Sequence, residues 1–159
     1  MSRVGIIGSG SFGIALAHVL NKNNEVKIWS YTKEETDSIN NNHKCIFIDD
    51  YVIDSNIKCY QDYEEVVKDS DYIVLVSPSV NTRSICKDIK KYITNQKIIL
   101  ASKGLDNGDL LSKVVIEELG ISPSIIREPS FADQIVKDIP TYINYCGEDD
   151  IKELFETDR

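Results

Sequence analysis

The chain has 159 residues, of which 42% are hydrophobic and 28% charged, and its formal net charge at pH 7 is −8. This length and composition predict one globular domain, residues 1–159, with a core of its own, and they do not suggest intrinsic disorder. The negative charge argues against nucleic acid as a partner, and no apolar run approaches the roughly 20 residues that a membrane span needs.

Short apolar runs rich in β-branched residues alternate with amphipathic stretches along the chain. The runs, each the size of a strand, are residues 4–7, 26–29, 57–60, 72–76 and 97–100. The amphipathic stretches are residues 12–20, 33–39, 63–68, 81–92 and 110–119, with an acidic one at 149–156. Parallel strands need a crossover connection, which a helix supplies. The alternation therefore predicts an α/β fold of Rossmann type, a doubly wound and mostly parallel sheet with helices on both faces.

A glycine-rich turn joins the first predicted strand to the first predicted helix, in the segment GIIGSGSFGIALA. Gly8, Gly10 and Gly13 give the spacing G-x-G-x-x-G. In such a turn the first glycine permits a tight bend, the second lets a pyrophosphate approach the backbone, and the third lets helix and strand pack closely. A glycine turn without a ligand is the alternative. The position in a βαβ alternation favours a dinucleotide site.

The end of the second strand reads IWSYTKEE. No carboxylate stands at Ser30 or Tyr31 to bind a ribose diol, and Lys33 is the nearest charge, so the pattern favours NADP over NAD. Glu34 and Glu35 come later, where we expect the first turn of a helix.

The segment LVSPSVNTR follows the strand at 72–76. Pro78 then lies beside the glycine loop at the carboxyl edge of the sheet, where ligands bind in this class of fold. A plain strand-to-helix turn with Ser79 as N-cap is the alternative.

The segment ASKGLDNGDLL follows the strand at 97–100 and places Lys103 at the same edge. A lysine there can bind an anionic substrate or a reacting oxygen, or it can be a solvated loop charge. Asp109 is the expected N-cap of the next helix.

The four cysteines, Cys45, Cys59, Cys86 and Cys146, form no C-x-x-C pair, and the chain has only two histidines. This spacing predicts no metal site. We expect reduced and mostly buried thiols. Strand-like sequence begins almost at residue 1, which leaves no room for a signal peptide, so we expect a cytoplasmic protein.

Together these segments resemble the N-terminal domain of bacterial NAD(P)-dependent glycerol-3-phosphate dehydrogenases. The resemblance covers nearly the whole chain and rests on GSGSFGIALA, KIWS, VSPS, ASKGLDNG with LLSKVVIEELG, and EPSFADQIVKDIPT. The combination of A-S-K-G and P-S-F-A in this order is specific, whereas either motif alone is not.

The resemblance implies hydride transfer between NADP or NAD and the pair glycerol 3-phosphate and dihydroxyacetone phosphate, a reaction that feeds glycerophospholipid synthesis. It implies a catalytic role for Lys103, which would contact both nicotinamide and substrate. The remaining implied contacts are Ser11, Phe12 and Ala132 to the cofactor, Tyr31 near its adenosine ribose, and Ser130 to the substrate.

Two departures from the family bear on substrate binding and turnover. Glu128 stands where the family has the glycine of G-P-S-F-A, so a carboxylate lies beside the substrate position and works against phosphate binding unless it turns outward. The family also continues into a helical substrate domain, with the proton-accepting lysine, which is absent from this chain. We therefore expect weak dinucleotide binding and no turnover by these 159 residues alone.

Two other functions fit parts of the same pattern. One is another NAD(P) reductase with the same opening, of the ketopantoate or hydroxyacid type, which the A-S-K-G and P-S-F-A pair disfavours. The other is a non-catalytic nucleotide-binding module. A homodimer is a further expectation, because the face that the helical domain would cover is expected to be apolar.

Overall fold

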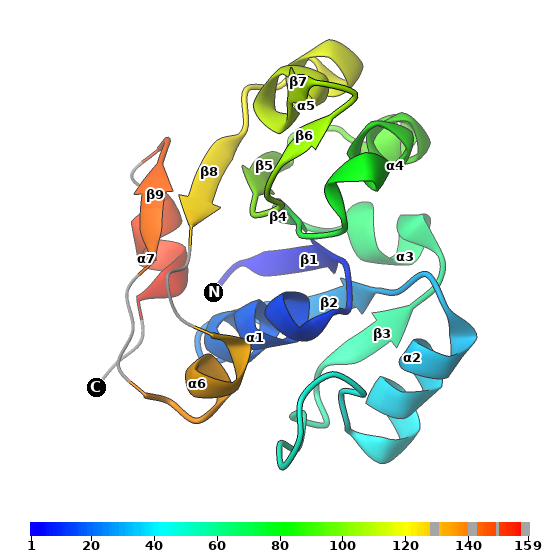
Figure 1. Cartoon of the computed structure of the whole chain (residues 1–159), viewed down its shortest axis with the longest axis vertical. Helices are drawn as coiled ribbons and strands as arrows, with labels where there is room; N and C mark the ends of the chain where they lie inside the picture. Colours follow the sequence, from blue (N-terminus) through cyan, green and yellow to red (C-terminus); the bar gives the residue numbers. More distant parts are fainter. Residues whose placement is uncertain (128–130, 140–142, 149, 157–159) are drawn as a thin grey trace.

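A seven-stranded sheet forms the centre of the computed structural model, which describes residues 1–127, 131–139, 143–148 and 150–156 (Figure 1). Its strand order is β3-β2-β1-β4-β5-β8-β9. The bounds are β1 Arg3–Ile7, β2 Glu25–Trp29, β3 Lys58–Tyr60, β4 Tyr72–Leu75, β5 Lys97–Leu100, β8 Ser124–Arg127 and β9 Asn144–Cys146. Neighbouring strands are parallel, except that β9 runs antiparallel to β8. The predicted Rossmann-type fold is confirmed, and its strand order reverses between β1 and β4.

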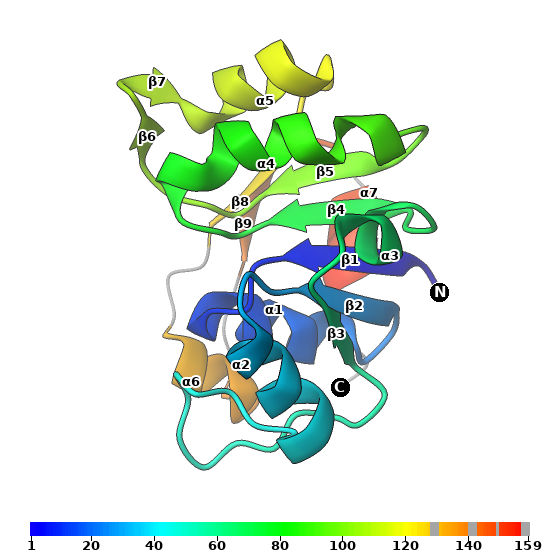
Figure 2. The same cartoon turned by 90° about the vertical axis from the view of Figure 1, so that its right-hand side faces the viewer.

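Helices cover both faces of this sheet (Figure 2). Their bounds are α1 Ser11–Leu20, α2 Lys33–Asp37, α3 Tyr63–Val67, α4 Thr82–Ile89, α5 Leu111–Leu119, α6 Ala132–Val136 and α7 Asp150–Phe155. Buried side chains of α1, α6 and α7 form one core cluster, and those of α3, α4 and α5 form the other. The central strands therefore lie between two apolar layers, which explains why their sequences are continuously apolar.

Strand β1 shows how the two layers are fixed. Val4 and Ile6 point into the α1 cluster, whereas Ile7 belongs to the cluster with α3. Gly5 faces α3 at close range, because a Cβ added there would lie 2.6 Å from the carbonyl oxygen of Val66. A side chain at Gly5 would therefore push α3 away from the strand that carries the glycine loop.

Several helix ends differ from the prediction. The helix expected at 81–92 is α4 with a short 3-10 turn at each end, Ser79–Asn81 and Lys90–Tyr92. Neither Ser79 nor Asp109 caps a helix, since α4 begins after Asn81 and α5 after Leu110, both without a side-chain capping bond. The Asp109 carboxylate instead accepts a hydrogen bond from Lys113 and lies near Arg83. These two cations compete with the backbone N–H groups of α5 for that carboxylate.

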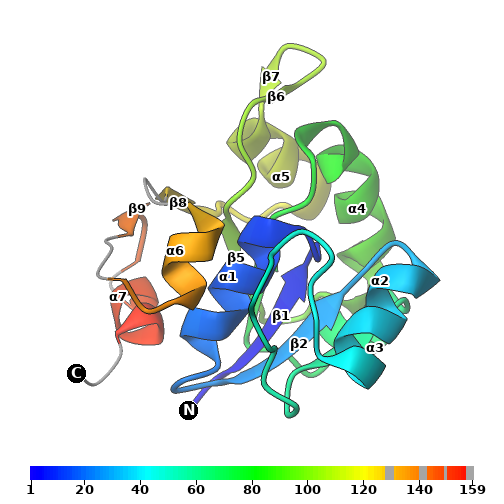
Figure 3. The same cartoon turned by 60° about the horizontal axis from the view of Figure 1, so that its bottom comes forward.

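A small hairpin was not predicted. Strands β6 (Leu105–Asp106) and β7 (Asp109–Leu110) pair antiparallel and project beyond α4 and α5 (Figure 3). The hairpin begins two residues after Lys103. Across the described ranges, no helix is long and apolar enough to cross a membrane.

Candidate functional site

A cavity of about 730 Å³ lies at the carboxyl edge of the sheet, where β1, β2, β4 and β5 end. Nine predicted site residues line it: Gly8, Gly10, Ser11, Phe12, Gly13, Tyr31, Pro78, Lys103 and Ala132. The structure thus brings them together, while their individual roles stay predictions. Glu128 and Ser130, the two further predicted substrate contacts, lie outside the described residues.

The glycine loop forms the floor of this cavity. Gly8 has φ +133°, a conformation that L side chains rarely adopt. A Cβ on Gly13 would lie 2.3 Å from the carbonyl oxygen of Gly8, whereas one on Gly10 would meet no atom within 4 Å. Gly8 and Gly13 therefore shape the turn, and Gly10 leaves open space over the cavity.

The N-terminus of α1 faces that space. Its N-cap is Gly10, without a side-chain capping bond, and the first turn holds no acidic residue. The first N–H groups of a helix have no intrahelical partner, and the helix dipole is positive at that end. A pyrophosphate fits here, because it supplies acceptors and negative charge where the protein supplies neither.

A carboxylate stands beside the loop, at the end of β2. The Oγ atoms of Ser9 and Ser30 lie 2.8 Å apart, and both are within hydrogen-bond distance of one Glu35 oxygen, at 2.7 and 2.8 Å. Each hydroxyl carries one hydrogen, so both donate to the carboxylate, which is the stronger acceptor. Both serines are buried. Glu35 lies in the first turn of α2, as predicted, but its orientation into the cavity was not predicted.

Aromatic side chains form the wall beyond β2. Trp29 is 8% exposed, stacks on Tyr63 at 4.3 Å and donates from Nε1 to the carbonyl oxygen of Gln61 at 2.9 Å. Tyr31 meets Trp29 edge to face and is 82% exposed. Trp29 is thus held rigidly, and Tyr31 presents its ring at the cavity mouth.

Serine hydroxyls join the ends of β4 and β5. Ser77 donates to the carbonyl oxygen of Ile7 at 2.9 Å, and Ser102 donates to that of Ser77 at 2.7 Å. These bonds tie three strand ends together. Lys103 follows directly, with its Nζ 5.9 Å from the centroid of the Phe12 ring, a cation–π distance.

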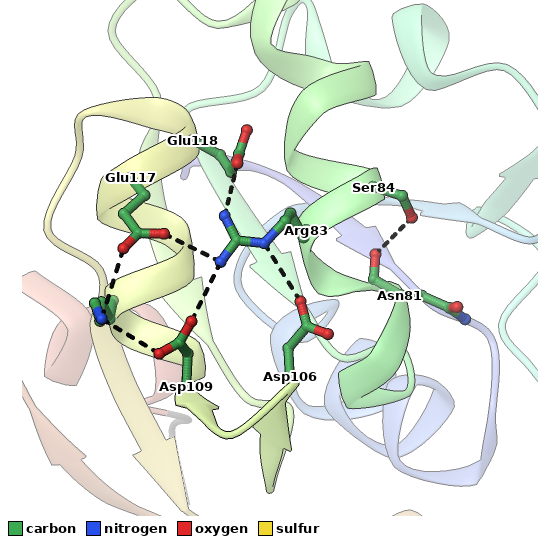
Figure 4. Close-up of polar contacts among 8 residues, drawn as sticks. Asn81, Arg83, Ser84, Asp106, Asp109, Glu117 and Glu118 are labelled. Atoms are coloured by element: carbon green, nitrogen blue, oxygen red, sulfur yellow. Dashed lines mark hydrogen bonds and ion pairs between the residues drawn. The ribbon is translucent and has the colours of Figure 1, made fainter.

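Arg83 of α4 connects the hairpin to α5 (Figure 4). Its guanidinium lies 2.7 Å from Glu118 and 3.0 Å from Glu117, both on α5. It also lies 3.6 Å from Asp106 on β6 and 3.7 Å from Asp109 on β7. Hydrogen bonds to Glu118 and Glu117 raise the pKa of Arg83. One arginine thereby positions the segment that follows Lys103.

Helix α6, which carries Ala132, is held against α1. The carboxylate of Asp138, just after α6, pairs with Lys22 and accepts a hydrogen bond from His18 Nε2 at 2.9 Å. Hydrogen bonds from Lys22 and His18 lower the pKa of Asp138. The wall on this side of the cavity is therefore fixed by charge as well as by packing.

The sequence did not single out Ser9 or Arg83. Ser9 lies inside the glycine loop and Ser30 ends the neighbouring parallel strand, so topology alone could have placed the two together. The contacts of Arg83 depend on a hairpin of two-residue strands, for which the sequence carries little signal. No group of three or more potential metal ligands occurs within the part of the chain that the structure describes.

Residues 3–151 match the family described as the NAD-dependent glycerol-3-phosphate dehydrogenase N-terminus. Glycerol-3-phosphate dehydrogenase (NAD(P)+) of Clostridium botulinum strain Alaska E43 is 39% identical over 93% of this chain and 46% of its own length. The Leptospira biflexa enzyme of the same name is 35% identical over 96% of this chain and 50% of its own. The chain spans about half the length of these curated relatives.

Comparison with solved structures points to the same family. The crystal structure of glycerol-3-phosphate dehydrogenase from Coxiella burnetii superposes with a TM-score of 0.92 at 28% identity, covering 99% of this chain and 52% of that one. A ketopantoate reductase from Ralstonia eutropha, at 13% identity and a TM-score of 0.62 over 79% of this chain and 41% of its own, shows only a shared fold.

Proposed function

Since the chain belongs to the family of NAD-dependent glycerol-3-phosphate dehydrogenase N-terminal domains, we propose that residues 1–159 form a dinucleotide-binding domain whose cavity takes NAD or NADP. The observation that carries this proposal is the uncapped N-terminus of α1, which faces the open space over Gly10. The protein supplies N–H donors there and leaves the acceptors to a ligand.

The proposed reaction is the interconversion of glycerol 3-phosphate and dihydroxyacetone phosphate, the pair implied by the names of the relatives. When bound, the nicotinamide supplies the site from which hydride leaves or to which it returns. Lys103 is the single cation among the described residues that line the cavity. Its ammonium is suited to hold the substrate's reacting oxygen, because a fixed positive charge stabilises negative charge that develops there.

The other predicted contacts complete the proposal. Ser11 and Phe12 in the first turn of α1, together with Pro78 after β4 and Ala132 at the start of α6, would contact the dinucleotide. Tyr31 would lie near the adenosine ribose. The sequence pattern at Ser30 and Tyr31 favours NADP, whereas the charges in the cavity favour NAD.

Three expectations stay predictions: a cytoplasmic location, a role in glycerophospholipid synthesis, and a homodimer. Sedimentation at several protein concentrations tests the homodimer, since a constant monomer mass would contradict it.

Binding is tested by thermal unfolding with and without dinucleotide. A ligand at 100 times its Kd stabilises the folded state by about 2.7 kcal/mol, which for this chain length corresponds to a rise in Tm of about 5–10 °C. We expect that rise with NADH or NADPH and none with nicotinamide alone. An unchanged Tm with both dinucleotides would contradict the proposal.

The proposed catalytic role of Lys103 is tested by the substitution Lys103→Met in a form of the protein that shows dehydrogenase turnover. Loss of one preorganised electrostatic contact typically lowers kcat about 10²- to 10³-fold. We expect that loss together with retained NADH binding. An unchanged kcat would remove Lys103 from the mechanism.

A further inference from the structure

We infer that Glu35 makes the cavity select NAD over NADP, by holding its carboxylate beside the position where the 2′ substituent of the adenosine ribose would lie. This inference rests on the proposed dinucleotide site. It departs from the sequence pattern, which favoured NADP because Ser30 and Tyr31 are not acidic and Lys33 is nearby.

The first step is the position of the carboxylate. In folds of this kind the pyrophosphate lies on the glycine loop and the adenosine ribose lies toward the end of the second strand, where an acidic side chain binds the 2′ hydroxyl. Glu35 comes from α2 and not from β2, but its carboxylate is bound by Ser9 of the loop and Ser30 at the end of β2. The Glu35 carboxylate therefore lies at the end of β2, where the ribose is expected, although its backbone belongs to α2.

The second step is the rigidity of that carboxylate. Two hydroxyls bind the same oxygen, Oε2, and they belong to serines that are 6% and 0% exposed. Among the described residues, Glu35 Oε1 has no hydrogen-bond partner. It is available to accept from a ribose hydroxyl without displacing either serine.

The third step is the distribution of cations. A 2′-phosphate is normally accommodated by an arginine near the end of β2. Here Lys33 forms an ion pair with Asp37 on its own helix and does not line the cavity. Lys103 lies after β5, three strand positions from β2, or about 14 Å away at about 4.8 Å per strand.

The fourth step is the charge balance. Of the described residues that line the cavity, Glu35 is the single acidic one. A 2′-phosphate would therefore bring its negative charge to the one corner that already holds a fixed negative charge. A ribose hydroxyl would instead find an acceptor there. The same carboxylate thus favours NAD and disfavours NADP.

The test is a fluorescence titration of the protein with NADH and with NADPH. We expect NADH to bind about tenfold or more tightly than NADPH, since like charges in direct contact are strongly unfavourable. Glu35→Gln keeps the side-chain shape and an oxygen for the two serines while removing the charge. It should reduce the NADH preference about tenfold, mainly by tightening NADPH binding.

Glu34→Gln is the matched control, because Glu34 lies in the same helical turn, is exposed and does not line the cavity. Its NADH preference should equal that of the wild type. If Glu35→Gln does not fold, the wild-type ratio decides the question, since equal or tighter NADPH binding overturns the inference. A Glu35→Gln protein that folds and keeps the wild-type ratio also overturns it. Failure of both dinucleotides to bind would overturn the proposed function itself, and the selectivity with it.

Discussion

The ammonium of Lys103 lies 5.9 Å from the centroid of the Phe12 ring, so the segment after β5 meets the first turn of α1 across the cavity. This contact joins two of the segments on which the family resemblance rests, the glycine loop and A-S-K-G. It places the proposed catalytic cation, Lys103, beside the N-terminus of α1, where we propose that the pyrophosphate binds. The proposed dinucleotide site and the proposed reaction site therefore line the same cavity.

Gly10→Val should weaken dinucleotide binding without lowering the stability of the fold. Gly10 has φ −69° and ψ −178°, an extended conformation that valine adopts readily, and its added carbons would fill the open space over α1. We expect at least about tenfold weaker NADH binding, the loss of one good interaction, with a Tm equal to that of the wild type. Calorimetric titration and thermal unfolding measure the two effects separately.

Gly13→Ala, in contrast, should lower the stability of the fold. Its Cβ would lie 2.3 Å from a backbone oxygen of Gly8, which cannot move without distorting the turn. Overpacking of this kind costs about 1–3 kcal/mol. The Tm should fall, as measured by circular dichroism. A Gly13→Ala protein as stable as the wild type would mean that helix and strand are not packed as described.

Arg83→Met should release the β6–β7 hairpin. The variant leaves the Asp106 side chain, which is 7% exposed, without its cation, and a buried unpaired carboxylate is unfavourable. We expect faster amide hydrogen exchange at residues 105–110 and a lower Tm. Lys113→Met is the control, since Lys113 is exposed and its pairs with Asp109 and Glu117 are surface pairs of small effect. Equal exchange in both variants would contradict the role of Arg83.

Thiol reactivity should separate one cysteine from the other three. Burial raises the pKa of Cys59 to about 11 and that of Cys86 to about 12, and it also raises that of Cys45. Cys146 is exposed. Since the thiolate is the reactive form, a disulfide reagent at neutral pH should modify one thiol quickly in the folded protein and four after unfolding. Rapid modification of two or more in the folded state would contradict the described core.

Stability should decrease in acid through Asp150. Its carboxylate is bound by Lys97 and Tyr72, each at 2.6 Å, and the bond from Lys97 is the main cause of its lowered pKa. A lowered folded-state pKa contributes stability that is present above the unfolded value of about 3.9 and is lost as pH falls through the folded value. Urea unfolding between pH 7 and 2 should show this loss. Asp150→Asn should weaken the pH dependence of the unfolding free energy. Lys97→Met should weaken it too, if the ion pair with Asp150 causes that dependence.

Much of the fold follows from the sequence for identifiable reasons. The central strands are continuously apolar because both faces are covered, and Gly8 and Gly13 are required by the geometry of the turn. The expected cap at Asp109 was wrong, because Arg83 and Lys113 attract its carboxylate.

The orientation of Glu35 could not be predicted from helical position. It depends on Ser9 and Ser30, which only the pairing of β1 with β2 brings together. Local rules describe neighbours along the chain, whereas these contacts depend on how separate segments meet.

The most direct test of the dinucleotide site uses the single tryptophan, Trp29, which lines the cavity. Its emission overlaps the absorption of NADH, so bound NADH should quench it and emit in turn. We predict a saturable decrease in Trp29 emission with a matching rise in nicotinamide emission, and both should need at least about tenfold more NADH in Gly10→Val. Unchanged Trp29 emission on adding NADH to the folded protein would contradict the account.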